Sequence, residues 1–258
     1  MRILVVGDVV GRPGREAVAR VLPRLREERG YDLVVCNGEN AAGGNGLTRA
    51  IADELRDAGC DVLTNGNHVW DQRQFVEEIK QLDYCVRPLN LDAAAPGRGW
   101  LVCRGVLVAN AIGRVFMAEA DNPYRAMERL LDGLAADAPR VRVVDWHAEA
   151  TSEKIAMGFF LDGRVSAVVG THTHVPTADA RVLANGTAFV SDIGMVGPRD
   201  SVLGLNPDEV VGRFRDGLPR RFRVADGPVQ FNAVDIDVDE TTGRARSIAR
   251  IDRLVEVA

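Results

Sequence analysis

Apolar runs that end in polar or glycine-rich tips recur along the first third of the chain. They lie within residues 2–7, 31–40 and 60–68. Between them, residues 14–30 and 48–59 carry apolar side chains at helical spacing, with Thr48 as the expected N-cap of the second helix. This alternation of buried strand, loop and helix predicts a largely parallel sheet with right-handed crossovers.

The middle and the end of the chain favour further strands. Residues 99–117 predict a hairpin, and residues 122–137 predict a helix opened by Asn122 and Pro123. The segments 141–149 and 164–174 again pass from an apolar run into a polar tip. The final third alternates as strands do, with turns at Asn185-Gly186 and within residues 240–244. No repeat or linker divides the sequence, so we expect a single domain over residues 1–258.

Composition narrows the class of protein. A chain of 258 residues with 46% hydrophobic content can bury a substantial core. Its 32 Lys and Arg against 37 Asp and Glu give a net charge of −5, which offers no electrostatic footprint for duplex nucleic acid or an anionic membrane. The four cysteines form no CxxC pair, which favours reduced thiols. Without a signal-peptide pattern or a bilayer-spanning apolar run, we expect a cytoplasmic protein.

All four histidines lie at or just beyond a predicted strand end, together with several carboxylate and amide side chains. The set comprises Asp8, Glu39, Asn40, Asn67, His68, His147, His172 and His174. Ligands gather at the carboxyl ends of parallel strands, so these side chains are expected to share one edge. On an extended stretch, His172 and His174 would point the same way. Two solvent histidines on a turn are the alternative, but the placement of the other two argues against it.

The chemistry of this set favours a metal site. Imidazole nitrogens and carboxylate oxygens suit iron, manganese or zinc, and the amide oxygen of Asn67 is a weaker ligand that makes sense only beside stronger ones. A carboxylate such as Glu39 could bridge two ions held close enough to clamp one phosphate. The sequence therefore predicts a dinuclear centre.

The ordered motifs resemble those of the calcineurin-like metallophosphoesterases. That pattern runs D-x-H, G-D-x-x-D, G-N-H-D/E, a single H and G-H-x-H, and the corresponding stretches here are GDVVG, NGENAAG, GNHVWD, DWHAE and GTHTH. Val10 stands where the first motif has histidine, and Glu39 stands where aspartate is usual. These two substitutions, together with the stretches GDVVGRPGR and GTHTHVPTAD, resemble the bacterial YmdB-like branch of this family. The similarity runs over nearly the whole chain.

The resemblance implies an α/β fold, a four-layer αββα sandwich of two mixed β-sheets flanked by helices. It implies two divalent or trivalent metal ions per subunit, with iron or manganese favoured and zinc compatible. One ion would be held by Asp8, Glu39, Asn40 and His174, and the other by Glu39, Asn67, His147 and His172. His68, left without a metal, would be the catalytic residue near the leaving oxygen, because imidazole titrates near neutrality.

The activity that the resemblance implies is a phosphodiesterase acting on small cyclic nucleotides, 2′,3′- or 3′,5′-cyclic, or related diesters, by attack of a metal-bridging hydroxide. Two alternatives stay open: a phosphomonoesterase acting on nucleotides or phosphoproteins, and a regulatory protein whose metal site binds a nucleotide or RNA. The expected partner is a small phosphodiester. Neither duplex nucleic acid nor a membrane is expected, and a homo-oligomer is compatible with the sequence.

Three further groups are weaker candidates. The glycines at 43, 44 and 46 lack the GxxxxGK[ST] form of a phosphate loop and are expected to form a pliable loop at positive φ. Asp71 and Asp179 could each orient an imidazole or cap a turn. Residues 192–204, including Asp192, Gly194 and Arg199, are better explained as an exposed loop than as a substrate contact.

Overall fold

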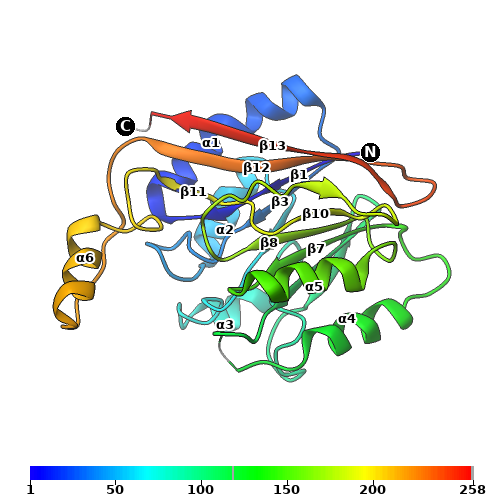
Figure 1. The fold of residues 1–258 in the computed structure, drawn as a ribbon, viewed down its shortest axis with the longest axis horizontal. Helices are drawn as coiled ribbons and strands as arrows, with labels where there is room; N and C mark the ends of the chain where they lie inside the picture. Colours follow the sequence, from blue (N-terminus) through cyan, green and yellow to red (C-terminus); the bar gives the residue numbers. More distant parts are fainter. Residues whose placement is uncertain (118, 257–258) are drawn as a thin grey trace.

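The first of two β-sheets carries both ends of the chain (Figure 1). It contains β1 (Arg2–Val6), β2 (Asp8–Val9), β3 (Leu33–Asn37), β4 (Val62–Thr64), β11 (Met195–Pro198), β12 (Val229–Val238) and β13 (Ala245–Val255). Strands β1, β3 and β4 are parallel, whereas β12 runs antiparallel to β1, β11 and β13. The sheet is therefore mixed, as the family resemblance implied. The largely parallel sheet predicted from the strand-loop-helix pattern is wrong here, because distant C-terminal strands join it.

The second sheet is built from the middle of the chain. It contains β5 (Trp100–Cys103), β6 (Val106–Ile112), β7 (Val141–His147), β8 (Ala167–Thr171), β9 (Arg181–Val182) and β10 (Ala188–Val190). Strands β6, β7, β8 and β10 are parallel, and antiparallel hairpin partners close both edges. The predicted hairpin is confirmed as β5 and β6, and the Asn185-Gly186 turn lies between β9 and β10.

The helices follow the predicted pattern in part. They are α1 (Gly11–Arg29), α2 (Arg49–Asp57), α3 (Phe75–Glu78) with the 3-10 turn η1 (Ile79–Gln81), α4 (Pro123–Asp132), α5 (Thr151–Leu161) and α6 (Pro207–Asp216). Thr48 and Asn122 cap α2 and α4 as predicted, each accepting backbone N–H bonds. The sequence pattern did not predict α5 or α6. Within the described part of the chain, no helix has the length and apolar character to cross a membrane.

Three packed cores define the layers of the fold in the computed structural model, which describes residues 1–117 and 119–256. The central core joins the facing sides of the sheets, for example Val35 of β3 and Val169 of β8. A second core packs Leu22 of α1 against the outer face of the first sheet. A third packs Met157 of α5 against the second sheet. Figure 1 shows α1 on one side and α4 and α5 on the other, which confirms the αββα sandwich.

The cysteines take no part in a covalent framework. All four are free thiols, as predicted, and Cys36, Cys60 and Cys85 are buried. Burial raises the pKa of the Cys85 thiol to about 12, so it stays protonated at neutral pH. Cys36, Cys60 and Cys85 therefore serve as small apolar residues of the core.

Candidate metal centre

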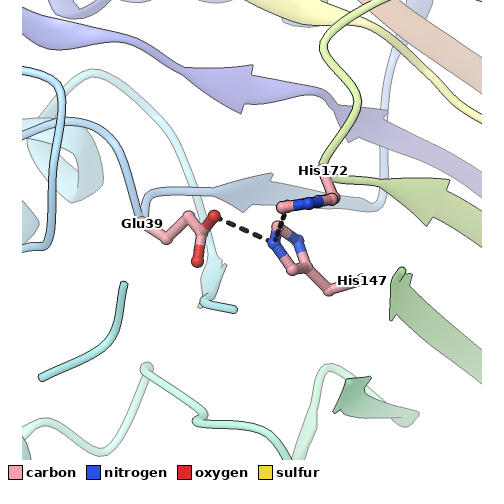
Figure 2. Close-up of side chains that lie close together, drawn as sticks. All are labelled: Glu39, His147 and His172. Atoms are coloured by element: carbon pink, nitrogen blue, oxygen red, sulfur yellow. Dashed lines mark hydrogen bonds and ion pairs between the residues drawn. The ribbon is translucent and has the colours of Figure 1, made fainter. Parts of the chain in front are cut away.

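The carboxyl ends of parallel strands from both sheets meet at one place. Glu39 follows β3, Asn67 follows β4, His147 is the last residue of β7 and His172 comes directly after β8. The ligand atoms of Glu39, His147 and His172 all lie within 4.8 Å of one another. Figure 2 shows these three side chains pointing toward a common centre. The predicted edge therefore lies between the two sheets, and each sheet contributes donors to it.

The Nε2 atom of His147 is the point on which these donors converge. It lies 2.9 Å from Glu39 Oε1, 3.0 Å from Asn67 Oδ1 and 3.0 Å from His172 Nδ1. One imidazole nitrogen carries at most one proton, so it cannot donate a hydrogen bond to all three neighbours. A group of nitrogen and oxygen donors around one point suits a metal ion. These four residues, the His147 cluster, are one of the ligand sets implied by the resemblance.

The remaining implied ligands are Asp8, Asn40 and His174. Asp8 Oδ1 is 4.0 Å from His174 Nε2 and 3.9 Å from His147 Nδ1. Asp8 Oδ1 and Asn40 Oδ1 are buried and accept no hydrogen bond among the described residues. Buried oxygens without a donor are costly, and a cation satisfies them. The donor set thus fits a metal beside Asp8 and Asn40 as well.

A glycine keeps the space between the donors open. A Cβ added to Gly66, in the loop after β4, would lie 2.3 Å from Glu39 Oε2 and 2.3 Å from His147 Nε2. Such contacts are shorter than real Cβ atoms make. Any larger residue would therefore fill the centre or push its donors apart, which gives the glycine of the GNH motif a structural reason.

Each of the three imidazoles has one nitrogen tied to the protein and the other turned toward the centre. The tied partners are Thr171 Oγ1, 2.8 Å from His147 Nδ1, Glu149 Oε2, 3.1 Å from His172 Nε2, and the Leu203 carbonyl oxygen, 3.0 Å from His174 Nδ1. Partners of this kind fix the orientation and tautomer of a metal-binding histidine. Sequence reasoning missed Glu149, although it stands in the DWHAE motif.

A buried hydrogen-bond chain runs beneath His147. The Thr171 hydroxyl donates to Asp145 Oδ1 at 2.6 Å, which leaves its lone pair for the N–H at His147 Nδ1. Asp145 Oδ2 also accepts from Asn37 Nδ2 at 3.0 Å and from the Thr64 hydroxyl. The chain holds a proton on Nδ1 and turns the lone pair of Nε2 to the centre. Sequence reasoning missed Asp145. A carboxylate inside the apolar run VRVVDWH was the signal that could have identified it, because a buried charge needs partners.

The histidines of GTHTH do not lie on an extended stretch, so that prediction is wrong. Strand β8 ends at Thr171, and His172 and His174 have φ of 98° and 62°, in the left-handed region. The backbone N–H of His172 donates to Asp8 Oδ2 at 3.2 Å. A tight turn, held by contacts from other elements, therefore brings both imidazoles to the centre.

Asp192 stabilises this turn through hydrogen bonds to Thr173. Its Oδ2 accepts the Thr173 N–H at 3.1 Å and the Thr173 hydroxyl at 2.8 Å, and it pairs with Lys154. Asp192 is buried, and β11 occupies residues 195–198. The prediction of an exposed loop over 192–204 is thus wrong for its first half. Arg199 is exposed and ion-paired with Asp200 at 2.9 Å.

His68 lies beside the centre, with its side chain partly exposed. Its Nδ1 is 2.7 Å from Asp71 Oδ2, and its backbone N–H donates to Glu39 Oε2 at 3.1 Å. The sequence left open whether Asp71 orients an imidazole or caps a turn. In the structure it orients the imidazole of His68. Asp179 instead accepts from the hydroxyls of Thr177 and Ser191 and so supports a turn.

Burial and mutual charge shift the pKa values of the central groups. Burial alone raises the pKa of Glu39, but His147 and His68 lower it to about 2. Burial alone lowers the pKa of His147, yet Glu39, Asp8 and Asp145 raise it to about 9. Burial raises the pKa of Asp8 to about 6, against the pull of His174 and His147. Without a metal, the centre thus holds a proton on His147 that a cation would replace.

Comparison with known proteins places this arrangement in a family. The model of the family described as YmdB-like protein matches residues 4–251. The chain belongs to the YmdB-like family. The family resemblance seen in the sequence is therefore confirmed over nearly the whole chain.

Relatives of this YmdB-like chain share both its sequence and its fold. A 2′,3′-cyclic-nucleotide 2′-phosphodiesterase of Bacillus subtilis (strain 168) is 44% identical over 255 residues, covering 97% of this chain and 96% of the relative. The crystal structure of a hypothetical protein from Thermus thermophilus has a TM-score of 0.91, 42% identity and coverage of 98% and 99%. That of a novel phosphatase from Mycoplasma pneumoniae has a TM-score of 0.93, 32% identity and coverage of 99% and 94%.

In this YmdB-like chain, the centre opens into a small cavity of about 250 Å³. Its lining includes Glu39, Asn40, His68, His172 and His174, as well as Val10, the residue that replaces the first-motif histidine. The glycines at 43, 44 and 46 have the positive φ expected of them, at 69°, 105° and 80°, and the loop they form stands at the rim of the cavity.

Proposed function

We propose that the protein is a dinuclear metal-dependent phosphodiesterase that hydrolyses small cyclic nucleotides, the 2′,3′-cyclic isomer first among them. The observation that carries this proposal is the convergence of Glu39, Asn67 and His172 on Nε2 of His147. The choice of substrate is supported by the Bacillus subtilis relative, which is described as a 2′,3′-cyclic-nucleotide 2′-phosphodiesterase.

The proposed ligands form two sets that share Glu39. One metal would be held by Asp8, Glu39, Asn40 and His174, and the other by Glu39, Asn67, His147 and His172. The donors are nitrogen and oxygen atoms without a thiolate, which suits iron or manganese and is compatible with zinc. The buried, unpartnered oxygens of Asp8 and Asn40 support this assignment.

The protein groups would divide the work of hydrolysis. When bound, the metals would neutralise the phosphoryl oxygens and activate water. Asp71 holds Nδ1 of His68, which leaves Nε2 to donate a hydrogen bond or proton to the departing oxygen. The wall of the cavity would orient the diester, since binding in a defined geometry lowers the barrier.

The decisive experiment compares diesters with a monoester. Metal-stripped protein is reloaded with Mn²⁺ and given bis(p-nitrophenyl) phosphate, p-nitrophenyl phosphate and 2′,3′-cyclic AMP, beside Asn67→Ala at equal concentration. Metal-dependent turnover of the diesters that is lost in the variant is the expected result. Equal turnover by parent and variant would refute the assigned ligand set.

Phosphomonoester hydrolysis is the second candidate function. The Mycoplasma pneumoniae structure, described as a phosphatase, supports it, and the same metal core can serve both chemistries. A higher rate on p-nitrophenyl phosphate than on the diesters would favour this candidate. A regulatory nucleotide- or RNA-binding role agrees less well with a donor set accompanied by His68 and its partner Asp71.

We also propose that residues 1–258 form one metallophosphoesterase domain. The central core supports this, because it joins the facing sides of both sheets, with Ile3 and Ile236 from one and Val108 and Val169 from the other. A cytoplasmic location and a homo-oligomeric state stay predictions.

A further inference from the structure

A second, larger cavity adjoins the small cavity at the proposed metal centre, which we call the metal cavity. Its volume is about 510 Å³, and it is lined by residues 42–45, Gln72, Leu205 and residues 220–222. Gly44, Asn45 and Leu205 also line the metal cavity, so the two cavities share a rim. We name the larger one the arginine cavity, after Arg220 and Arg221 in its wall.

The lining of the arginine cavity has the chemistry that binds a nucleotide. Its lining residues include two arginines, Asn45, Gln72 and Phe222, and no carboxylate. Guanidinium groups match phosphate oxygens in a two-pronged geometry. An aromatic ring gives a base a surface on which to stack. Cation, amide and aromatic ring thus stand together in one concave site.

The two arginines differ in their partners. Arg220 makes two contacts of 2.6 Å with the carboxylate of Asp216, which fixes its guanidinium at the wall. Arg221 is exposed and has no carboxylate within 4.0 Å in the described parts of the chain. Its charge is therefore available to a phosphate, with Arg220 as a rigid neighbour.

The small size of the metal cavity favours a substrate that extends beyond it. Its volume of about 250 Å³ is below the roughly 300–1,000 Å³ usual for small-molecule sites. The shared rim leads from it into the arginine cavity, which gives a nucleotide held at the metals room to extend.

The rim between the two cavities includes a glycine and is fixed by hydrogen bonds. Gly44 lines both cavities and contributes no side chain to the rim between them. Asn40 Nδ2 donates to the Gly44 carbonyl at 3.0 Å, and the Gly44 N–H donates to the Asn40 carbonyl at 3.1 Å. A proposed metal ligand is thus tied directly to the rim that a substrate would cross.

We propose that the arginine cavity binds the nucleotide on the 5′ side of the reacting ribose, so that the favoured substrate is the 3′ end of a short RNA carrying a 2′,3′-cyclic phosphate. The linking phosphate contacts Arg221, and a base stacks on Phe222. This inference rests on the proposed function. It also selects between isomers, because a 3′,5′-cyclic phosphate uses the 5′ oxygen in its ring and leaves none for a preceding nucleotide.

The test is a binding measurement that does not depend on turnover. The Mn²⁺-loaded full chain is titrated by calorimetry with adenosine 3′-phosphate and with the dinucleotide adenylyl-(3′→5′)-adenosine 3′-phosphate. We expect the dinucleotide to bind about tenfold more tightly. Arg221→Ala should abolish this preference without changing the affinity for the mononucleotide. The control is Arg213→Ala, an exposed arginine of α6 outside the cavity lining, which should keep it.

Salt dependence gives a readout that a general loss of structure would not produce. Removing one phosphate contact should reduce the slope of log affinity against log salt for the dinucleotide by about 0.7 in Arg221→Ala, while the slope in Arg213→Ala stays parental.

Three results would overturn the inference: equal affinity of the parent for both ligands, equal losses in the two arginine variants, or equal weakening of both ligands by Arg221→Ala. The last would mean that the cavity holds the mononucleotide itself. Failure of the proposed function is distinguishable. If the parent prefers the dinucleotide and Arg221→Ala does not, nucleotide binding in the arginine cavity is supported even if no ester is hydrolysed. If 2′,3′-cyclic AMP is hydrolysed but the parent shows no dinucleotide preference, the proposed function stands and this inference is refuted.

Discussion

Lys154 Nζ lies 2.5 Å from Asp192 Oδ2, and their side chains are only 2% and 1% exposed. Lys154 comes from α5 and also donates to the Thr171 carbonyl at 2.8 Å, whereas Asp192 accepts from Thr173. The pair therefore holds the backbone on both sides of His172. Because His172 adopts left-handed φ, its conformation depends on such support.

Replacing this lysine should weaken both the fold and metal binding. Lys154→Met leaves the Asp192 carboxylate buried without its partner, a change that costs about 3–5 kcal/mol in comparable buried pairs. We expect a lower melting temperature together with weaker Mn²⁺ binding, measured by thermal unfolding and by chelator competition. Lys80→Met, which removes an exposed pair with Glu77, should change neither. Parental Mn²⁺ affinity in Lys154→Met would show that the pair does not position the histidines.

The hydroxyl beneath His147 should matter for metal affinity more than for folding. Thr171→Val keeps the side-chain shape but removes the link between Asp145 and His147. We expect about a 10- to 100-fold loss of Mn²⁺ affinity. The matched control is Thr187→Val, a buried threonine whose hydroxyl donates to the Val165 carbonyl. Equal metal affinity in the two variants would contradict a role for Thr171 in orienting the imidazole.

Metal binding should depend on pH through His147. Its pKa of about 9 in the metal-free protein means that it carries a proton at pH 7, which a metal must displace. Apparent affinity should rise about tenfold per pH unit up to about pH 9, with release of about one proton. Calorimetry in buffers of different ionisation enthalpy measures this release. Metal uptake at pH 7 without proton release would contradict the assignment of His147.

The same raised pKa gives the metal-free protein a pH-dependent stability. A folded-state pKa above the usual 6.5 stabilises the fold fully below about pH 6.5, and this contribution is lost as pH rises through about 9. Bound metal should remove that dependence, because His147 then has no proton to lose. Melting temperatures of stripped and loaded protein between pH 6 and pH 9 would reveal the difference.

His68 should affect turnover without affecting metal content. His68→Ala removes the proposed donor to the leaving oxygen, so diester hydrolysis should fall by about 10²- to 10⁴-fold with both metals retained. Asp71→Asn should give a smaller loss, since the imidazole remains but loses the carboxylate that orients it. The measurement is steady-state hydrolysis alongside metal analysis. Parental turnover by His68→Ala would disprove its catalytic role.

Sequence alone determined the family, the stretches that carry the proposed site and, through the family resemblance, the αββα fold. The reason for the site stretches is local: apolar runs specify strands, and each polar tip follows its strand in the chain. Glu39, His147 and His172 could be selected because they stand at such tips. The family's order of motifs then supplied the pairing of ligands that spacing could not provide.

Only the tertiary structure decided what supports the donors. Asp145 accepts from Asn37, 108 residues away, and Lys154 pairs with Asp192, 38 residues away. Such contacts depend on how separate strands and helices pack, so no local sequence pattern predicts them. The same holds for the left-handed turn at His172, which local preference disfavours and distant partners stabilise. Chain order thus determined which groups could react, and packing determined their orientation and charge.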